Sequence, residues 1–258
     1  MLPHTARAPL KLRLWQQNMW KLLHNTDYIL NQANPKDFDL LLIQEPWFDK
    51  LGKSQGMPNW QIIYPPGIYQ EHHEPICSIM LVNTNISTEA YTTLAIPSSE
   101  ITAIHLRGYF RQCTIVNIYN DCTNNDTIHL LSNYLNMHAH VITPETTDHM
   151  FWCGNFNHHH PLWEEEYNKH LFSSPDMINP FIDLIIKYNM LIILPLGIQT
   201  YKTTTGNWTW LDNVWHNDIP NNPVTICDVD PSLCPPLANH LPIRMVLNLP
   251  VSRAHTPP

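Results

Sequence analysis

The sequence predicts an α/β fold in which a two-sheet β-sandwich core is flanked by helices. Short β-like runs bounded by turn residues recur along the chain, and segments with helical periodicity are fewer. Two runs, 40–43 (LLLI) and 191–194 (LIIL), are wholly apolar, which is typical of strands covered on both faces. With 258 residues, of which 43% are hydrophobic, the chain is long enough to bury the large core that this fold needs.

Eleven runs are expected to form strands, because each is apolar or alternating and ends at turn residues. They cover residues 10–18, 39–46, 60–66, 77–83, 101–107, 113–120, 150–157, 190–196, 208–215, 224–230 and 240–249. Helices are expected at 20–33, at 125–138 behind a polar TNND cap, and at 175–189, which contains Pro180. No linker or repeat divides the chain, so we expect one domain at 10–250 with flexible tails at 1–9 and 251–258.

Charge is sparse and unevenly distributed. Charged residues make up 14% of the chain against a usual figure of about 25%, and the formal net charge is −8. A negative molecule repels polyanions unless its cations are segregated. The one basic strip visible in the sequence is N-terminal and comprises Arg7, Lys11, Arg13 and Lys21. The 16 histidines predict acid sensitivity, because buried neutral imidazoles must take up protons as the pH falls.

Neither a secretion signal nor a membrane span is visible in the sequence. The first twenty residues lack the apolar segment of a signal peptide, and no run approaches the ~18 apolar residues of a span. We therefore expect a soluble intracellular protein, and no signal assigns it to the nucleus. The six cysteines form no CxxC pair and several lie in strand-like runs, which favours buried reduced thiols over disulfides or zinc ligands.

Polar residues end three of the apolar strands. Asn18 follows LKLRLWQQ, Glu45 follows DLLLIQ, and Tyr119 follows CTIVNI. Active sites of α/β proteins commonly lie at the carboxyl ends of strands. A carboxylate at the end of a buried strand is costly without a partner, so Glu45 is either a magnesium ligand or half of an internal ion pair. Its surroundings in the sequence favour the two alternatives equally.

The segment 154–163, GNFNHHHPLW, also follows an apolar strand. Its three consecutive histidines suggest either a solvated loop or a zinc site, and the loop is favoured because adjacent residues do not easily direct three side chains at one ion. The pair Asn239-His240 opens the final strand, where a single histidine is most often a satisfied hydrogen-bonding residue.

Taken in order, these motifs resemble those of the endonuclease/exonuclease/phosphatase superfamily, and in particular the endonuclease domain of fungal non-LTR retrotransposons. The resemblance covers nearly the whole chain. Asn18 in QQNMWK and Glu45 in IQEPW correspond to the family's metal-site Asn and Glu, and Tyr119 in NIYND to its active-site tyrosine. The family's G-D-F-N-x-H-H-P-x-W box appears as GNFNHHHPLW, its S/T-x-I-D motif as TWLD ending at Asp212, and its D-H-x-P-I terminus as NHLPI.

The resemblance implies a four-layer fold and hydrolysis of a phosphodiester in DNA. It implies Mg²⁺ or Mn²⁺ held by Glu45 with Asn18, because hard cations prefer oxygen ligands. His240 would hydrogen-bond or protonate the phosphate, with Asp212 fixing its tautomer. Tyr119 and Asn157 would hold the scissile phosphate by donating hydrogen bonds.

Two positions depart from the family pattern. Asn155 and Asn239 stand where the family has catalytic aspartates. An amide keeps the shape of the carboxylate but has no useful basicity, so Asn155 cannot act as a general base, and loss of such a base typically costs about 10² to 10⁴ in rate. With Asn239 neutral, metal affinity is expected to fall as well.

Three functions are compatible with these residues. The first is a weakened Mg²⁺-dependent enzyme that nicks DNA. The second is a non-catalytic descendant that binds nucleic acid or another protein, and the net charge of −8 favours a protein, since non-specific DNA affinity comes mainly from Lys and Arg. The third is a folded product without a cellular role.

Overall fold

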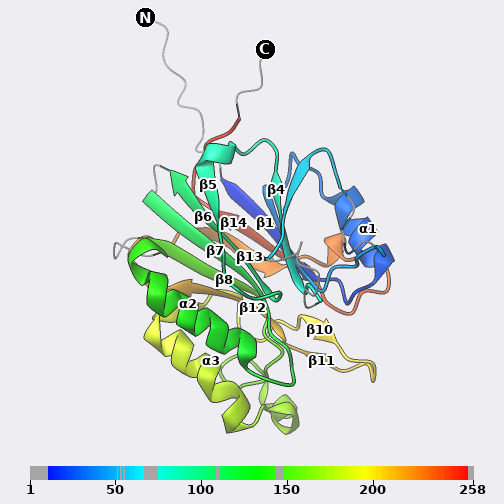
Figure 1. Cartoon of the computed structure of the whole chain (residues 1–258). Coiled ribbons are helices and arrows are strands. Elements are labelled where there is room, and N and C mark those ends of the chain that lie inside the picture. Colours follow the sequence, from blue (N-terminus) through cyan, green and yellow to red (C-terminus); the bar gives the residue numbers. More distant parts are fainter. Residues whose placement is uncertain are drawn as a thin grey trace, which may run out of the picture.

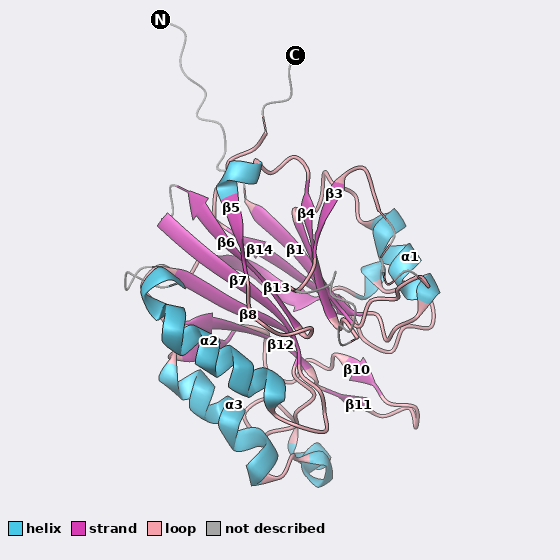
Figure 2. Cartoon of the chain, viewed as in Figure 1, coloured by secondary structure: helices cyan, strands magenta, loops and turns pink. Residues whose placement is uncertain are grey.

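The computed structural model describes residues 11–50, 52, 54, 56–66, 75–108, 111–142 and 148–254. Two mixed six-stranded sheets pack face to face, with helices on the outer faces (Figure 1). This is the predicted α/β sandwich, with α1 on the outside of one sheet and α2 and α3 side by side on the outside of the other (Figure 2).

The first sheet has the order β13-β14-β1-β2-β4-β3. Its strands are β1 (Leu12–Asn18), β2 (Leu40–Gln44), β3 (Trp60–Ile63), β4 (Ser78–Asn83), β13 (Val224–Val229) and β14 (Ile243–Leu247). Only β1 and β2 are parallel, and their register pairs Asn18 with Gln44. Both strands therefore end at the same edge of the sheet.

The second sheet has the order β5-β6-β7-β8-β12-β9. Its strands are β5 (Tyr91–Leu94), β6 (Ile101–Gly108), β7 (Arg111–Tyr119), β8 (His149–Asn155), β9 (Met190–Ile192) and β12 (Asp212–Asn217). Here β7 and β8 are the parallel pair, and Tyr119 lies opposite Asn155. A separate hairpin is formed by β10 (Tyr201–Lys202) and β11 (Trp208–Thr209).

The helices are α1 (Leu23–Gln32), α2 (Asp126–Ile142) and α3 (Pro175–Lys187). Helix α1 begins three residues after the expected start, because Trp20 and Lys21 adopt the left-handed conformation. Pro180 lies inside α3 without breaking it. Proline has no N–H to offer the carbonyl four residues earlier, and Asn125 Nδ2 donates to that carbonyl, Asp176 O, at 3.1 Å instead.

The core lies mainly between the two sheets and beneath α2 and α3. A smaller apolar cluster lies between α1 and the first sheet. All eleven expected strand runs contain a strand, but the run 208–215 is split into β11 and β12, and the sequence analysis missed β5 and β10. All six cysteines are free thiols, and Cys77, Cys113 and Cys153 are buried as expected.

The C-terminal end of the fold differs from the sequence expectation. Val251 is buried, and Arg253 forms an ion pair with Asp39 at 2.5 Å, so residues 251–254 pack against the first sheet where a tail was expected. The expected tail residues 1–9 and 255–258, and with them Arg7, lie outside the described residues. No helix in the described segments combines the length and apolar character needed to cross a bilayer.

Candidate phosphodiester site

The candidate site lies where the parallel pairs β1/β2 and β7/β8 end. Gln44 Nε2 of β2 donates to Asn117 Oδ1 of β7, which joins the two sheets at this end. Gln17 Nε2 of β1 donates to the His240 carbonyl at 2.8 Å, which holds the segment before β14 beside the end of β1. Residues far apart in the sequence thus meet at one edge of the sandwich.

Glu45 follows β2 and forms an ion pair. Lys21 Nζ lies 3.5 Å from Glu45 Oε1, and Asn18 Nδ2 donates to Glu45 Oε2 at 3.0 Å. Glu45 therefore has the ammonium of a half-exposed lysine within ion-pair distance. Asn18 and Glu45, the predicted metal ligands, are therefore brought together, but with an amide N–H between them.

The loop after β1 places Lys21 beside Glu45. Trp20 and Lys21 both have φ of 52°, and Glu45 has φ of 45°, all in the left-handed region that non-glycine residues rarely adopt. Trp20 N donates to Asn18 Oδ1 at 2.7 Å, and Lys21 N donates to the Glu45 carbonyl at 2.8 Å. These bonds hold the strained backbone. In the sequence, Lys21 stands out only as part of the N-terminal basic strip.

Asp212 and His240 form a second, buried pair. His240 Nδ1 lies 2.8 Å from Asp212 Oδ2, and both side chains are almost fully buried. Asp212 begins β12 opposite Asn155, and its N–H donates to Thr200 Oγ1 at 3.0 Å. The ring of Tyr201 packs on that of His240 with centroids 4.6 Å apart. No sequence signal marked Thr200 or Tyr201.

The segment at the end of β8 brings two of the predicted polar residues, Asn155 and Asn157, together. Asn155 Oδ1 accepts a hydrogen bond from the backbone N–H of Asn157 at 2.9 Å. Asn157 has φ of 52°, and its Nδ2 donates to the Asn120 carbonyl at 2.7 Å. One N–H of the Asn157 amide is therefore already engaged, and the other is left for a ligand.

Tyr119 is half-buried at the end of β7, beside Asn155 in the register of the sheet. Burial raises the pKa of its hydroxyl, and the negative charge of Glu45 raises that pKa further. The phenol therefore stays protonated at neutral pH and keeps a proton to donate.

Asn239 is held by a hydrogen bond to its backbone carbonyl, whereas its side-chain oxygen has none. Its carbonyl accepts from Lys202 N at 2.7 Å, while its Oδ1 is buried without a hydrogen-bond partner, as is Asp212 Oδ1. Orphaned buried acceptors are uncommon in folded proteins, and functional sites are one place where they occur.

The three consecutive histidines point at three different partners. Asn120 Nδ2 lies 3.2 Å from His158 Nε2, His159 Nδ1 lies 2.7 Å from Glu164 Oε1, and His160 Nδ1 accepts from Leu162 N at 3.2 Å. Burial, with a smaller effect of His159, lowers the pKa of His158 to about 4. This arrangement is that of a hydrogen-bonded loop.

The residues implied to hold Mg²⁺ or Mn²⁺ do not fit a divalent cation in this arrangement. Asn18 Oδ1 accepts from Trp20, and both oxygens of Glu45 face donors. Asn155 and Asn239 contribute no charge. Across the described residues, no three His, Cys, Asp or Glu side chains are grouped so that they could hold a metal ion.

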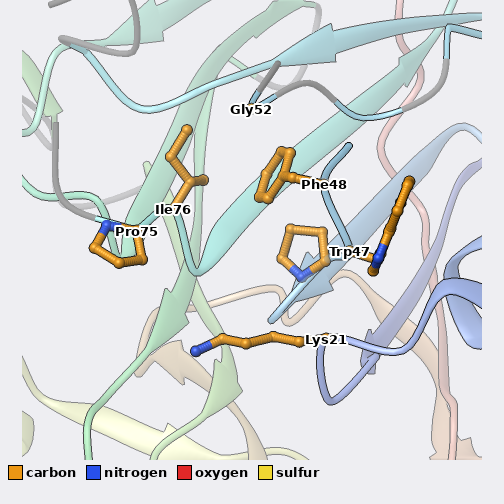
Figure 3. A pocket seen from close by; sticks show the side chains of 7 residues that line it. Lys21, Trp47, Phe48, Gly52, Pro75 and Ile76 are labelled. Atoms are coloured by element: carbon orange, nitrogen blue, oxygen red, sulfur yellow. The ribbon is translucent and has the colours of Figure 1, made fainter. Parts of the chain in front are cut away.

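An apolar pocket adjoins the Lys21–Glu45 pair. It has a volume of about 340 Å³ and is lined by Lys21, Pro46, Trp47, Phe48, Gly52, Pro75 and Ile76. Figure 3 shows Lys21 extended along one side of this pocket, with its ammonium group on the side of Pro75. The ammonium thus lies beside this apolar lining and within ion-pair distance of Glu45.

Solved structures of nucleases share this architecture. The endonuclease domain of TRAS1, a telomere-specific non-LTR retrotransposon, has a TM-score of 0.70 at 12% identity, with 92% of this chain and 99% of that one covered. The AP endonuclease LMAP from Leishmania major has a TM-score of 0.70 at 12% identity, covering 92% of this chain and 87% of its own. The chain has the endonuclease/exonuclease/phosphatase fold. The expected four-layer sandwich is therefore confirmed.

The same fold occurs in the 3′-5′ exonuclease NExo from Neisseria meningitidis, with a TM-score of 0.65, 12% identity, and coverage of 92% of this chain and 99% of that one. No protein-family model matches the sequence, and no curated protein matches it. The likeness to these structures is therefore one of fold.

Proposed function

We propose that the chain is a nuclease-type domain, of the kind found in retrotransposons, which binds a phosphodiester of DNA and whose ancestral Mg²⁺-dependent hydrolysis is weakened. The observation that carries this proposal is the buried Asp212–His240 pair, at 2.8 Å, beside the strand ends that bear Tyr119 and Asn155. A fold shared with nucleases supports it.

His240 would act on the phosphate through Nε2, because Nδ1 is engaged by Asp212. The carboxylate fixes the orientation of the ring, so that Nε2 is directed away from Asp212 and, when both ring nitrogens carry protons, can donate a hydrogen bond or a proton to a phosphate oxygen. Tyr119, kept protonated, and the second N–H of Asn157 would donate further hydrogen bonds to the same group.

Activation of the attacking water is the step for which the proposed site has no general base. Asn155 occupies the general-base position, and its Oδ1 accepts the Asn157 N–H but has no affinity for a proton at neutral pH. When bound, a divalent cation would polarise the phosphate, but Glu45 is paired with Lys21. On this proposal the groups that would bind the phosphate are present and the base that would activate water is not, so we expect a rate about 10² to 10⁴ below that of an enzyme with its base.

Nicking of supercoiled plasmid in Mg²⁺ tests the proposal. We expect Asn155→Asp plus Asn239→Asp to nick at least tenfold faster than the unmodified chain, and Glu45→Ala to abolish that gain. Asn31→Asp plus Asn222→Asp adds the same charge at two exposed positions and serves as the matched control.

Two results contradict the proposal. If the unmodified chain nicks as fast as the double variant and loses activity with Glu45→Ala, the amides are tolerated and catalysis is not weakened. If no variant nicks and none binds DNA, the site is not a phosphodiester site.

A non-catalytic descendant that binds nucleic acid or protein is the second candidate. The intact Asp212–His240 pair beside two neutralised positions favours it, because the fold survives without the catalytic carboxylates. Affinity that falls steeply with added salt indicates a nucleic-acid partner, whereas a protein partner need not show this dependence.

A further inference from the structure

We propose that the Lys21 ammonium takes the place of a divalent cation at Glu45, so that this chain binds phosphodiesters without metal. This inference rests on the proposed function in one respect only, that this edge of the sandwich receives a phosphate. The positive charge that contacts the phosphate would then come from Lys21 itself.

The contacts of Glu45 oppose binding of a second cation. Lys21 Nζ lies 3.5 Å from Oε1, and the Asn18 amide donates to Oε2 at 3.0 Å. A divalent ion on either oxygen would displace a donor and would face the ammonium across one carboxylate. With Asn155 and Asn239 neutral, no further negative charge at these positions offsets that repulsion.

The backbone places the Lys21 side chain at the Glu45 end of β2. Two consecutive residues, Trp20 and Lys21, adopt the left-handed conformation, which is costly for side-chain-bearing residues and persists only where surrounding bonds enforce it. Those bonds are present: Asn18 Oδ1 accepts from Trp20 N, and the Glu45 carbonyl accepts from Lys21 N. The same two residues that hold the loop, Asn18 and Glu45, are the ones that would ligate a metal.

The ammonium remains available to a ligand. Lys21 is 55% exposed while Glu45 is 11% exposed, so the pair opens to solvent on the lysine side. An ammonium has three N–H donors, and one faces Glu45. The others can donate to phosphate oxygens, as lysine does in many phosphate sites. Lys21 and Glu45 together carry no net charge, so binding is expected to be weaker than at a metal-loaded site.

Metal binding is the first test. We would titrate Mn²⁺ into the unmodified chain, Lys21→Met and Lys36→Met, and follow free Mn²⁺ by electron paramagnetic resonance. Lys36 is exposed and precedes β2, at the opposite end of the strand that Glu45 follows, so it controls for loss of charge alone. We expect Lys21→Met to bind Mn²⁺ at least tenfold more tightly than the other two, and Glu45→Gln to remove this gain.

DNA binding is the second test, measured by fluorescence anisotropy with a short labelled oligonucleotide. The unmodified chain should bind equally well in EDTA and in Mg²⁺. Lys21→Met should lose at least tenfold in affinity in EDTA, and Lys36→Met should not. If Lys21→Met folds poorly, Lys21→Gly replaces it, because glycine adopts the left-handed backbone conformation without strain. Lys21→Gly should show the same loss of DNA affinity and the same gain in Mn²⁺ affinity.

Either of two outcomes overturns the inference: Mn²⁺ affinity that Lys21→Met and Lys21→Gly leave unchanged, or DNA binding by the unmodified chain that EDTA abolishes. Neither measurement depends on strand cleavage. The double reversion, Asn155→Asp plus Asn239→Asp, separates the two proposals. If it fails to nick plasmid while Lys21→Met gains Mn²⁺ affinity, the proposed function fails and the role of Lys21 stands.

Discussion

Single residues at this site are constrained mainly by the backbone around them. Gly154, just before Asn155 in the GNFN box, has φ of 151° and lies against the backbone of Ile118 in the neighbouring parallel strand. A Cβ at this position would overlap the Ile118 carbonyl, which belongs to the rigid β7/β8 pair and cannot move aside. The register that sets Tyr119 beside Asn155 therefore depends on a glycine.

We expect Gly154→Ala to lower the free energy of unfolding by about 3 kcal/mol or more, because the added methyl group forces the two strands apart. Urea denaturation measures this change. Gly56→Ala is the control, since a Cβ there meets nothing within 4 Å. Equal stabilities for the two variants would contradict the close packing of β7 on β8.

At the scale of elements, the two sheets are joined beneath the site by a buried polar cluster. The two N–H groups of the Asn117 amide in β7 are shared among the Ile43 carbonyl of β2 at 3.1 Å and the Ile79 carbonyl and Ser78 Oγ of β4, each at 2.9 Å. Its oxygen accepts from Gln44 Nε2. Because these bonds span both sheets, they set the alignment of the strand ends that form the site.

Removal of this side chain should destabilise the fold. Asn117→Ala leaves several buried partners unpaired, so we expect a loss of about 2 to 4 kcal/mol in the free energy of unfolding, against less than about 1 kcal/mol for Asn31→Ala on the exposed face of α1. Plasmid nicking by the double reversion should fall with Asn117→Ala as well, because the strand ends lose their alignment.

The elements show which parts of this structure are visible in the sequence. Strand ends are predictable because apolar runs stop at polar residues, and Asn18, Glu45 and Tyr119 were found in this way. Lys21, Thr200 and Asn117 were missed because their roles come from contacts with distant segments. The run 208–215 reads as one strand, but Trp210 N donates to Glu164 Oε1 at 2.7 Å, which diverts the chain between β11 and β12.

At the scale of the whole molecule, buried histidines make stability depend on pH. Burial, with a smaller effect of His149, lowers the pKa of His216 to about 3, and His158 falls to about 4 for the same main reason. These values lie below the usual 6.5, so the unfolded chain binds more protons than the folded chain as the pH falls. Stability is therefore present at neutral pH and lost below about pH 6.5.

We expect each of these two histidines to remove about 1 kcal/mol of unfolding free energy between pH 7 and pH 5.5. Chemical denaturation across this range measures the loss, and His216→Gln should reduce its slope. A flat free energy between pH 7 and pH 5.5 would falsify the sequence-based expectation of acid sensitivity.

One thiol of this chain offers a site for a fluorescent label that reports oligonucleotide binding. All six cysteines lie in the described residues, and Cys122 is the one with an exposed side chain, three residues after Tyr119. Burial raises the pKa of the other five thiols, which makes them slow to alkylate. A maleimide fluorophore would therefore attach at Cys122 without prior removal of any cysteine, and its emission would report directly on oligonucleotide arriving at the edge of the sandwich.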